Sequence, residues 1–525
     1  MERRRFLKVA ASAAAAGGLA PGNLLAAPPA VDGRRPEGSP ARVLQDTEVA
    51  LGNGEPPALQ FQAYPGGTGA LFERLIRERG AAAFERRPLD IEPWDGPVPA
   101  REEDVAFLPV DRLGALVRER KISPVELTEI YLERLQRYDP ILLCAVTILE
   151  GPAREAAEQA EAEIRRGEWR GPLHGIPWGV KDLFAVRGTP TTWGSAAFQD
   201  QVIDEDSDVV VRLREAGAVL IAKLSTGEFA RGANWFRGQT LNPWNLEEGS
   251  SGSSAGPASA TAAGCVAFAI GTETQGSIVS PARRCGLTAL RPTFGRVSRH
   301  GGMVLAWSMD KVGPLCRTAE DCALVFDVIH GADPKDASTL TTPFEFERRT
   351  DLSGIRIGIA EDAPDSFAMS LRDLGADLRP LPELPEGGSE ALSVESAAAF
   401  DFHVADLGSQ GQEGEEARFQ AGRTVPGLDY VQSQRRRMIL MQQMEEALEG
   451  VDLFVSGSGL VGVTNQTGHP AVILPYTFGP REDAEHEQPV CTTLIGRPFT
   501  DDLLLTVAHA YQSVTSWHLE RPSLD

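Results

Sequence analysis

The sequence predicts an α/β fold, and three observations lead to this class. Short apolar segments with strand character alternate with helical segments along most of the chain, as in layered α/β proteins. A helix at 208–216 is followed by Gly217, a typical helix C-cap, and then by a strand at 218–222. The same order returns at 355–378, although the sequence contains no internal repeat. With 525 residues, of which 42% are hydrophobic, the chain is long enough for a large core.

The clearest helix begins after Ser123. Ser123-Pro124-Val125-Glu126 forms a capping box with proline at the first helical position, and apolar residues then recur at helical spacing up to Leu135. The acidic stretch 383–416, rich in Pro, Gly, Glu and Ser, is expected on the surface. The other expected elements are helices at 69–79, 110–120, 153–166 and 366–374, strands at 355–360, 377–378, 451–455 and 471–474, and an amphipathic helix at 503–517.

The N-terminus has the pattern of an export signal. The Arg-Arg-x-Phe-Leu-Lys sequence from Arg3 to Lys8 precedes an Ala-rich stretch and resembles a twin-arginine signal. We expect residues 1–30 to form a signal peptide that is cleaved near Ala27 or Ala30, which predicts a periplasmic or extracellular protein without stable membrane association. An uncleaved anchor is the alternative, but the apolar region is short and interrupted by glycine. Residues 31–106 are expected to form an N-terminal arm.

The composition and the motifs argue against several classes of partner and cofactor. A net charge of −23 argues against nucleic acid or an anionic membrane as a partner. The histidines lack metal-ligand spacing such as H-E-x-x-H, and the sequence has no phosphate-binding P-loop motif, so we expect neither metal nor cofactor. The six cysteines are too few and too scattered for a disulfide framework. Cys265 and Cys285 are expected in the core, and a bridge between Cys316 and Cys322 stays open.

The stretch 249–293 is the most informative part of the chain. It joins a dense Gly/Ser loop, a small apolar middle at 258–270 and a second glycine-flanked serine, Ser277. A flexible linker would separate two polar boundaries, whereas this run leads into apolar residues. Backbone N–H groups in such loops can approach a ligand closely. The pattern therefore indicates a buried element between two functional loops.

Three motifs, in this order, resemble the amidase signature family. They are Gly175-Ile176-Pro177-Trp178-Gly179-Val180-Lys181-Asp182, Gly252-Ser253-Ser254-Ala255-Gly256, and Gly271-Thr272-Glu273-Thr274-Gln275-Gly276-Ser277-Ile278 followed by Pro281-Ala282. The resemblance extends from about Leu108 to the C-terminus, and Glu-Thr-x-Gly-Ser is most similar to the peptide amidase branch. It implies a domain at 107–525 built on a single large mixed β-sheet covered by helices on both faces.

The resemblance also implies a Ser–cis-Ser–Lys triad. It assigns Ser277 as nucleophile, Ser253 as the serine after a cis peptide bond at Gly252–Ser253, and Lys181 as base. A lysine with the usual pKa of about 10.4 is charged, but burial among apolar neighbours lowers that pKa. Taken singly, the lysine would be a surface ion-pair residue and the serines turn or cap residues. The implied oxyanion donors are the backbone N–H groups of Thr274, Gln275, Gly276 and Ser277.

Two positions depart from the family pattern, so the resemblance does not predict the substrate pocket. An arginine that often follows the nucleophile is Val279 here, and one of two paired glycines is Gln275. Neither change removes a triad member. Three further polar residues beside the motifs are expected to be structural. Asp182 would hold its loop by hydrogen bonds, and His174 and His469 would pack or form hydrogen bonds.

A weaker motif lies near the C-terminus. Residues 457–462 fit G-x-G-x-x-G, which binds a dinucleotide only when a helix follows. The turn-rich segment 464–470 comes next, so we expect no dinucleotide site. The family resemblance instead makes 456–469 a wall of the substrate site.

These observations predict an exported amidase that cleaves the C–N bond of a small-molecule carboxamide through an acyl-serine intermediate. An ester or carbamate hydrolase on the same triad is one alternative. A glutaminase-type amidotransferase subunit is another, although tRNA charging is cytoplasmic and the export signal argues against it. A non-catalytic periplasmic binding protein of the same fold is the third. The sequence leaves a homodimer open.

Overall fold

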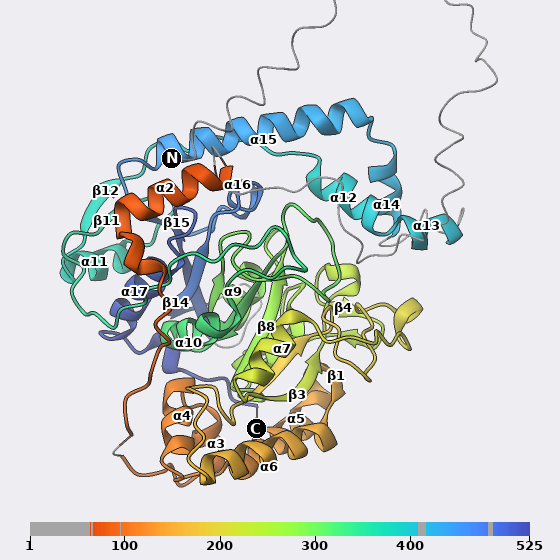
Figure 1. Cartoon of the computed structure of the whole chain (residues 1–525), viewed down its shortest axis with the longest axis vertical. Coiled ribbons are helices and arrows are strands. Elements are labelled where there is room, and N and C mark those ends of the chain that lie inside the picture. The colour runs from red at the N-terminus through yellow and green to blue at the C-terminus, as the bar shows by residue number, and fades with distance from the viewer. Residues whose placement is uncertain (1–63, 65–66, 95, 408–415, 481–486, 525) are drawn as a thin grey trace, which may run out of the picture. The chain divides into compact units, whose positions relative to one another are not determined.

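A mixed β-sheet of 11 strands forms the centre of the computed structural model, which describes residues 64, 67–94, 96–407, 416–480 and 487–524 (Figure 1). In order across the sheet, the strands are β1 (Ala145–Ile148), β3 (Val219–Leu224), β2 (Pro177–Lys181), β8 (Phe268–Glu273), β10 (Lys311–Cys316), β9 (Thr288–Arg291), β14 (Ala471–Gly479), β15 (Gln488–Gly496), β13 (Leu453–Ser456), β11 (Arg356–Ile359) and β12 (Asp377–Pro380). β2 is parallel to β3 and β8, and β11 is parallel to β12 and β13. The other neighbours are antiparallel. The predicted single mixed sheet is thereby confirmed.

The remaining elements surround this sheet. Two short hairpins pair β4 (Asn234–Trp235) with β5 (Gly238–Gln239) and β6 (Leu241–Asn242) with β7 (Asn245–Gly249). The α-helices of the described residues are α2 (Gly67–Arg79), α3 (Glu102–Ala106), α4 (Val110–Arg118), α5 (Pro124–Leu142), α6 (Glu150–Arg165), α7 (Asp208–Glu215), α8 (Ala255–Ala262), α9 (Val279–Cys285), α10 (Ala319–Ile329), α11 (Asp365–Asp373), α12 (Ala391–Ala399), α13 (Asp401–Leu407), α14 (Glu416–Arg423), α15 (Gly427–Ala447), α16 (Val461–Thr467) and α17 (Asp501–Gln512). Short 3₁₀ helices are η2 (Ala81–Phe84), η3 (Ala196–Phe198), η4 (Glu228–Ala230) and η6 (Trp517–Leu519).

Helices cover both faces of the sheet. Successive residues of a strand point to opposite faces, so neighbouring residues of β9 report on the two sides. Ala289 belongs to a buried cluster with Ala282 of α9. Leu290 belongs to a larger cluster that contains Phe326 of α10 and Leu504 of α17. The family resemblance implied this two-sided covering.

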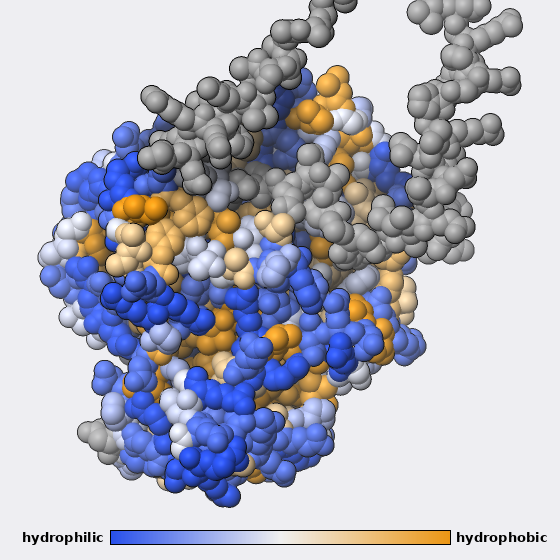
Figure 2. All heavy atoms as spheres, viewed as in Figure 1, coloured by the Kyte–Doolittle hydropathy of each residue, from blue (hydrophilic) through white to orange (hydrophobic). Residues whose placement is uncertain are grey.

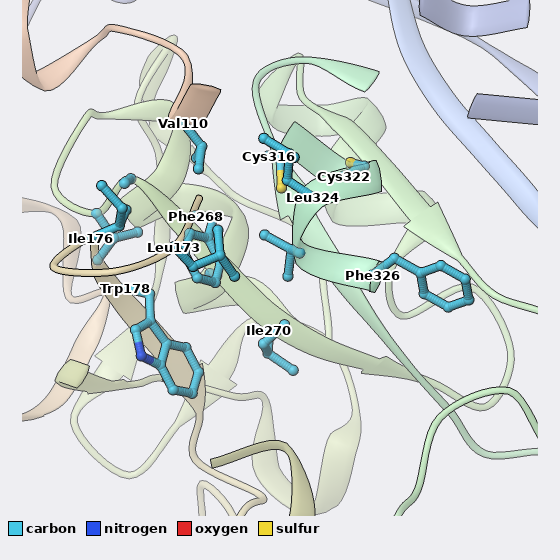
Figure 3. Close-up of a cluster of buried hydrophobic side chains, with 14 of the residues drawn as sticks. Val110, Leu173, Ile176, Trp178, Phe268, Ile270, Cys316, Cys322, Leu324 and Phe326 are labelled. Atoms are coloured by element: carbon cyan, nitrogen blue, oxygen red, sulfur yellow. The ribbon is translucent and has the colours of Figure 1, made fainter. Parts of the chain in front are cut away.

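The larger cluster forms the main core. Figure 3 shows Trp178 of β2 with Phe268 and Ile270 of β8 in this cluster, together with side chains of α10 such as Leu324. Trp178 and Phe268 are register partners on neighbouring strands, and their rings stack with centroids 5.8 Å apart. Each aromatic side chain buries a large apolar area, which is the main favourable contribution to folding. The core thus fixes the two strands that lead into the candidate site.

Several predicted elements are confirmed. Helix α5 begins with the capping box, in which Ser123 Oγ accepts a hydrogen bond from Glu126 N and Ser123 N donates to the Glu126 carboxylate. Helix α7 ends before Gly217, whose φ of 79° lies in the left-handed region, and β3 follows. Helix α2 lies at 67–79, within the predicted arm.

The expectation that 383–416 lies on the surface is wrong for most of its central part. Helix α12 buries Ala391 and Glu395, and Phe400 and Val404 join an aromatic cluster. Glu395 accepts hydrogen bonds from Ser308 N (2.8 Å) and Ser308 Oγ (2.6 Å). The acidic composition suggested a solvent-exposed segment, because buried charges need specific partners. The partner of Glu395, Ser308, lies far away in the sequence.

Two further expectations need correction. Segment 464–470 is not a simple turn, because α16 covers Val461–Thr467. Its polar side chains bond back along the helix, with Asn465 Nδ2 donating to Val461 O at 2.8 Å and Thr467 Oγ1 to Val463 O at 3.0 Å. The C-terminal helix α17 is buried on nearly every side rather than amphipathic, since it packs against both α10 and the sheet.

The hydrophilic face and the free cysteines agree with the expectations drawn from the composition. Figure 2 shows a face on which hydrophilic residues predominate. All six cysteines are buried and free, so Cys265 and Cys285 lie in the core as expected and the Cys316–Cys322 bridge is not formed. No helix in the described ranges is long and apolar enough to cross a membrane. The predicted signal peptide at 1–30 and the arm up to residue 63 lie outside the described residues.

Candidate active site

The predicted base, Lys181, is the last residue of β2. The parallel neighbour β8 pairs in register through Val180 and Ile270, so Lys181 lies beside the end of β8. Parallel strands bring their carboxyl ends to one edge of a sheet, where ligand sites of α/β folds commonly form. The loops that leave this edge contain the other predicted residues.

The Lys181 amine is fully buried and surrounded by hydroxyl groups. Its Nζ lies 2.8 Å from Ser253 Oγ, 2.8 Å from Thr272 Oγ1 and 3.1 Å from Ser254 Oγ. Burial lowers the pKa of Lys181 well below that of an ordinary lysine, and the negative charges of Asp310 and Glu273 only partly oppose this shift. Burial therefore favours the neutral form of this amine.

The loop from β7 to α8 positions Ser253. The Gly252–Ser253 peptide bond is cis, as the resemblance implied. A Cβ atom on Gly252 would lie 1.8 Å from Gly232 O, so only glycine fits before Ser253. Ser254 N donates to Ser277 O at 3.1 Å, which ties this loop to the predicted nucleophile loop. Ser254 Oγ donates to Thr272 O, also at 3.1 Å.

Ser277 lies between β8 and α9. Its side chain is partly exposed, and among the described residues its hydroxyl has no hydrogen-bond partner. The backbone N–H groups of Thr274 through Ser277 likewise have no acceptor in the described parts of the chain. Gly276 has a φ of 94°, which turns the backbone in the left-handed region between the strand and the helix. The Gln275 side chain is exposed to solvent and leaves this turn intact.

Glu273 closes the nucleophile loop from inside. Its carboxylate accepts hydrogen bonds from Ile278 N and Val279 N, both at 2.8 Å, at the start of α9. It also pairs with Arg291 Nη1 at 2.9 Å and accepts from Asn465 Nδ2 at 2.7 Å. Burial alone would raise the pKa of Glu273, but these partners hold it below its usual value. A single carboxylate thus joins β8, α9, β9 and α16.

Asp310 also supports this loop. Thr274 Oγ1 donates to its carboxylate at 2.6 Å, and Leu305 N and Ala306 N donate at 2.8 and 3.0 Å. Burial raises the pKa of Asp310. The loop before β10 is thereby attached to the first residue of the predicted oxyanion group.

Asp182, His174 and His469, which are expected to be structural, form hydrogen bonds or ion pairs within the fold. Asp182 accepts from Thr192 N at 2.9 Å and forms a buried ion pair with Lys223 Nζ at 2.7 Å. His174 Nε2 lies 3.1 Å from Glu163 Oε2, and His469 Nδ1 lies 2.7 Å from Thr467 Oγ1. The hydrogen bonds and ion pairs described for these three side chains do not involve the predicted triad.

A cavity of ≈ 410 Å³ adjoins both serine loops. Val279, at the first departure from the family pattern, contributes to its wall, as do two residues of the segment predicted to form a wall of the substrate site, 456–469. The cavity is lined by Glu248, Ser251, Val279, Ser280, Arg283, Arg284, Ser458 and Val461.

The motifs alone did not assign roles to Ser254, Thr272, Glu273, Asp310 and Asn465. Thr272 lies in β8, but the sequence does not show that its side chain faces Lys181. Glu273 and Asn465 meet across 192 residues of sequence, and Asp310 follows Thr274 by 36 residues. Such contacts leave no local pattern.

Comparison with known proteins agrees with this architecture. The model of the family described as Amidase matches residues 126–379. A glutamyl-tRNA(Gln) amidotransferase subunit of Roseiflexus sp. (strain RS-1) is 33% identical over 482 residues, which are 79% of this chain and 97% of that protein. A putative amidase, AmiD, of Mycobacterium tuberculosis (strain ATCC 25618 / H37Rv) is 33% identical over 475 residues, or 82% of this chain and 99% of that protein.

A solved structure is also similar. The native peptide amidase from Stenotrophomonas maltophilia superimposes with a TM-score of 0.70 at 28% sequence identity, covering 79% of this chain and 98% of that one. Fold and likeness together define an enzyme that hydrolyses amides. The chain belongs to the amidase family, with the fold that its three motifs implied.

Proposed function

We propose that this amidase cleaves a small-molecule carboxamide through an acyl-Ser277 intermediate, with Lys181 and Ser253 as its proton relay. The observation that carries the proposal is the 2.8 Å contact between the buried Lys181 Nζ and Ser253 Oγ. A neutral amine has one lone pair and two N–H donors. Because Ser254 Oγ already donates to Thr272 O, it accepts one N–H of the amine. When Thr272 Oγ1 accepts the other N–H, the lone pair is left for the Ser253 proton.

The first half of the reaction forms the acyl-enzyme. Ser277 Oγ attacks the carbonyl carbon while its proton passes to Ser253, and the Ser253 proton passes to Lys181 Nζ. The N–H groups of Thr274 through Ser277 stabilise the oxyanion that develops. When the C–N bond breaks, Lys181 returns its proton through Ser253 to the leaving amine. Water then attacks the acyl-Ser277 ester by the same relay, which releases the carboxylic acid and restores Ser277.

Covalent labelling tests the nucleophile. We expect a broad fluorophosphonate probe to add one adduct to the wild type, seen in the intact-protein mass, and none to Ser277→Ala. Ser370→Ala, which changes a serine of α11, should label like the wild type. Lys181→Met should label at least ~100-fold more slowly because the relay has lost its base. An inert wild type of native fold would favour a non-catalytic binding protein.

The substrate panel then separates the hydrolase classes. Amides, esters and carbamates of one acyl group are compared by kcat/KM, and amide turnover with an acyl-enzyme intermediate is the expected result. The likeness to an amidotransferase component makes a glutaminase function the second candidate. Hydrolysis confined to glutamine, and only with partner subunits present, would favour that candidate.

We also propose export through the N-terminal signal. Its support is the Arg-Arg-x-Phe-Leu-Lys sequence from Arg3 to Lys8 before an Ala-rich stretch. In a bacterium with a twin-arginine system, the protein should reach the periplasm and lose about 30 residues. Replacement of Arg3 and Arg4 by lysine should retain it in the cytoplasm. Equal export of both forms would contradict the proposal.

A further inference from the structure

A short turn, residues 227–232, lies directly against the loop that carries Ser253. Gly227 N donates a hydrogen bond to Ser253 O at 3.4 Å. A Cβ atom on Gly252 would lie 1.8 Å from Gly232 O, so the two loops are also in close backbone contact at the other end of the turn. The turn therefore contacts the residues on both sides of the Gly252–Ser253 bond, and a change in its shape would move Ser253.

This turn has a backbone shape that its own residues disfavour. Phe229 and Ala230 have φ values of 46° and 61°, in the left-handed region where a Cβ atom crowds the backbone. Glycine adopts such a shape freely, but these two residues do not. Other residues keep this conformation only where their surroundings hold it, and such positions gather at functional sites. The contacts that hold the turn are those of Phe229.

The Phe229 side chain is fully buried against the helices that follow β12. Its ring centroid lies 5.2 Å from that of Phe400 and 5.7 Å from that of Phe419. The Phe229 carbonyl accepts a hydrogen bond from Arg418 Nη2. Phe400 directly follows α12, and Arg418 and Phe419 belong to α14, which packs against α12 (Figure 1). Helices α12 and α14 thus hold both the ring and the carbonyl of Phe229.

The N–H group of Phe229 leads to the strand that carries the predicted base. Phe229 N donates to Trp193 O at 2.9 Å, and Trp193 N donates to Asp182 O at 3.2 Å. Asp182 directly follows Lys181. Phe229 and its turn therefore connect helices α12 and α14 to the Ser253 loop and to the end of β2.

We infer that Phe229 is a positioning residue for the proposed proton relay and that helices α12 and α14 hold it in place. The inference rests on the proposed acyl transfer at Ser277. With these helices packed on the Phe229 ring, the turn keeps its strained shape and Ser253 Oγ stays 2.8 Å from Lys181 Nζ. When the packing is weakened, the turn relaxes and Ser253 moves away from the amine. Turnover then falls although all three residues of the triad are unchanged.

Two substitutions on α14 test the inference without altering the turn itself. Arg418→Gln removes the donor to the Phe229 carbonyl, and Phe419→Leu weakens the ring contact. Each should lower kcat about tenfold or more and leave KM within about twofold, because a small displacement of a reacting group slows proton transfer more than binding. The rate at which a fluorophosphonate labels Ser277 should fall by the same factor as kcat. Arg418→Lys, which keeps a donor, should recover part of the lost kcat.

Matched controls come from the same helix and from another buried ring. Arg423→Gln removes the same charge from an exposed position on α14, where Arg423 pairs with Asp401. Phe367→Leu trims a buried ring of α11 that contacts Tyr511. Both controls should keep the wild-type kcat. Thermal midpoints of all variants are measured, and the assays are run well below the lowest one, so that a loss of stability is not counted as a loss of turnover.

A double-mutant cycle measures the coupling directly. Phe229→Leu combined with Phe419→Leu should lower kcat by less than the product of the two single factors, whereas Phe229→Leu combined with Phe367→Leu should give the product. Unchanged kcat in Arg418→Gln and Phe419→Leu, an equal fall in Phe367→Leu, or a full product in the first pair would overturn the inference. A wild type with neither amide turnover nor a Ser277 adduct would instead overturn the proposed function.

Discussion

At the scale of single residues, the environment of Lys181 combines two opposing influences. Burial favours the neutral amine, whereas the carboxylates of Asp310 and Glu273 favour the ammonium form. The first influence is the larger one, because the pKa of Lys181 lies well below its usual value. The two carboxylates also hold the predicted nucleophile loop, so they couple the geometry of this loop to the protonation of the predicted base.

The substitution Asp310→Asn tests both the charge of this carboxylate and its support of the loop. Removal of a negative charge near an ammonium group lowers its pKa further, so the acidic limb of the pH–kcat/KM profile should move to lower pH. Because Leu305 N and Ala306 N would then face an amide group, the loop at Thr274 should loosen and kcat should fall by about tenfold or more. Stopped assays across pH 5–9 measure both effects.

Asp365→Asn, at an exposed carboxylate on α11, serves as the control and should keep the wild-type profile. An acidic limb that stays in position in Asp310→Asn would show that Asp310 has no electrostatic effect on the base.

The motifs predicted candidate site residues but not the residues that support them. Lys181, Ser253 and Ser277 could be named because each lies in a compact motif, and the structure brings Lys181 and Ser253 into contact. Ser254 and Thr272, which also contact the Lys181 amine, lie in the same motifs, but no feature of the sequence distinguishes them from their neighbours. Their role depends on which side of a strand or helix start faces the lysine, and only the folded backbone decides that.

At the scale of elements, helix ends are held by specific polar residues. The capping box of α5 was predictable because its residues lie three apart in sequence. The start of α4 is different, since Val110 N donates to Asp321 Oδ1 of α10 at 2.7 Å across 211 residues. Helix boundaries with local caps can be predicted from sequence, whereas this one depends on tertiary packing.

Loss of the local cap should have a modest cost. Ser123→Ala removes the acceptor for Glu126 N and should lower the free energy of unfolding by about 1 kcal/mol. Urea denaturation followed by circular dichroism measures the change. Ser123→Asp, which retains an acceptor, should unfold close to the wild-type midpoint, and an equally large loss in this variant would argue against the capping explanation.

The distant cap should make stability depend on pH. Burial and the charge of Asp111 raise the pKa of Asp321 to about 7, far above its usual value, and burial raises that of Asp111 to about 6. An acid whose folded pKa is raised binds its proton more tightly in the folded state. This pair therefore costs stability as the pH rises from about 4 to about 7, and the cost is complete above that range.

Asp321→Asn removes the part of this dependence that comes from Asp321 and keeps an acceptor for Val110 N. At pH 8 the variant should be more stable than the wild type by on the order of 1–3 kcal/mol, and near pH 4 the two should be similar. Thermal unfolding midpoints at both pH values measure the difference. A variant that is less stable at pH 8 would show that the Asp321 charge stabilises the fold.

At the scale of the whole molecule, a buried charged cluster attaches the helices α12 and α15 to the active-site side of the sheet. Arg437 of α15 is fully buried and donates to Ser308 Oγ at 2.6 Å and to Ser308 O at 2.7 Å. Glu395 of α12 accepts from the same Ser308. Ser308 precedes Asp310 by two residues, so this cluster and the loop support share one short segment.

Arg437→Met should destabilise the protein by about 3–5 kcal/mol, because it removes the nearby positive charge that opposes the cost of burying Glu395. The double variant Arg437→Met/Glu395→Gln should recover part of this loss. Equilibrium unfolding in guanidinium chloride compares the three proteins. If the double variant were no more stable than the single one, the loss would come from packing rather than from an unpaired charge.

The sheet as a whole was predictable only through the family motifs. Alternating segments indicated an α/β class, but the order of strands brings β9 next to β14 and β13 next to β11, pairs that no local pattern connects. The acidic segment 383–416 was misplaced for the same reason, because its buried partners, such as Ser308, come from another part of the chain.

The pairing of β9 with β14 has a consequence for biosynthesis. Arg291 donates to His469 O, and Asn465 donates to Glu273, so these supports of the predicted nucleophile loop form only after residues 465–469 have left the ribosome. Domains generally fold as units during or after synthesis. A nascent chain that already contains the lysine and both serines therefore lacks the framework for hydrolysis. Catalytic competence should therefore appear only once the segment up to His469 can pair with β9.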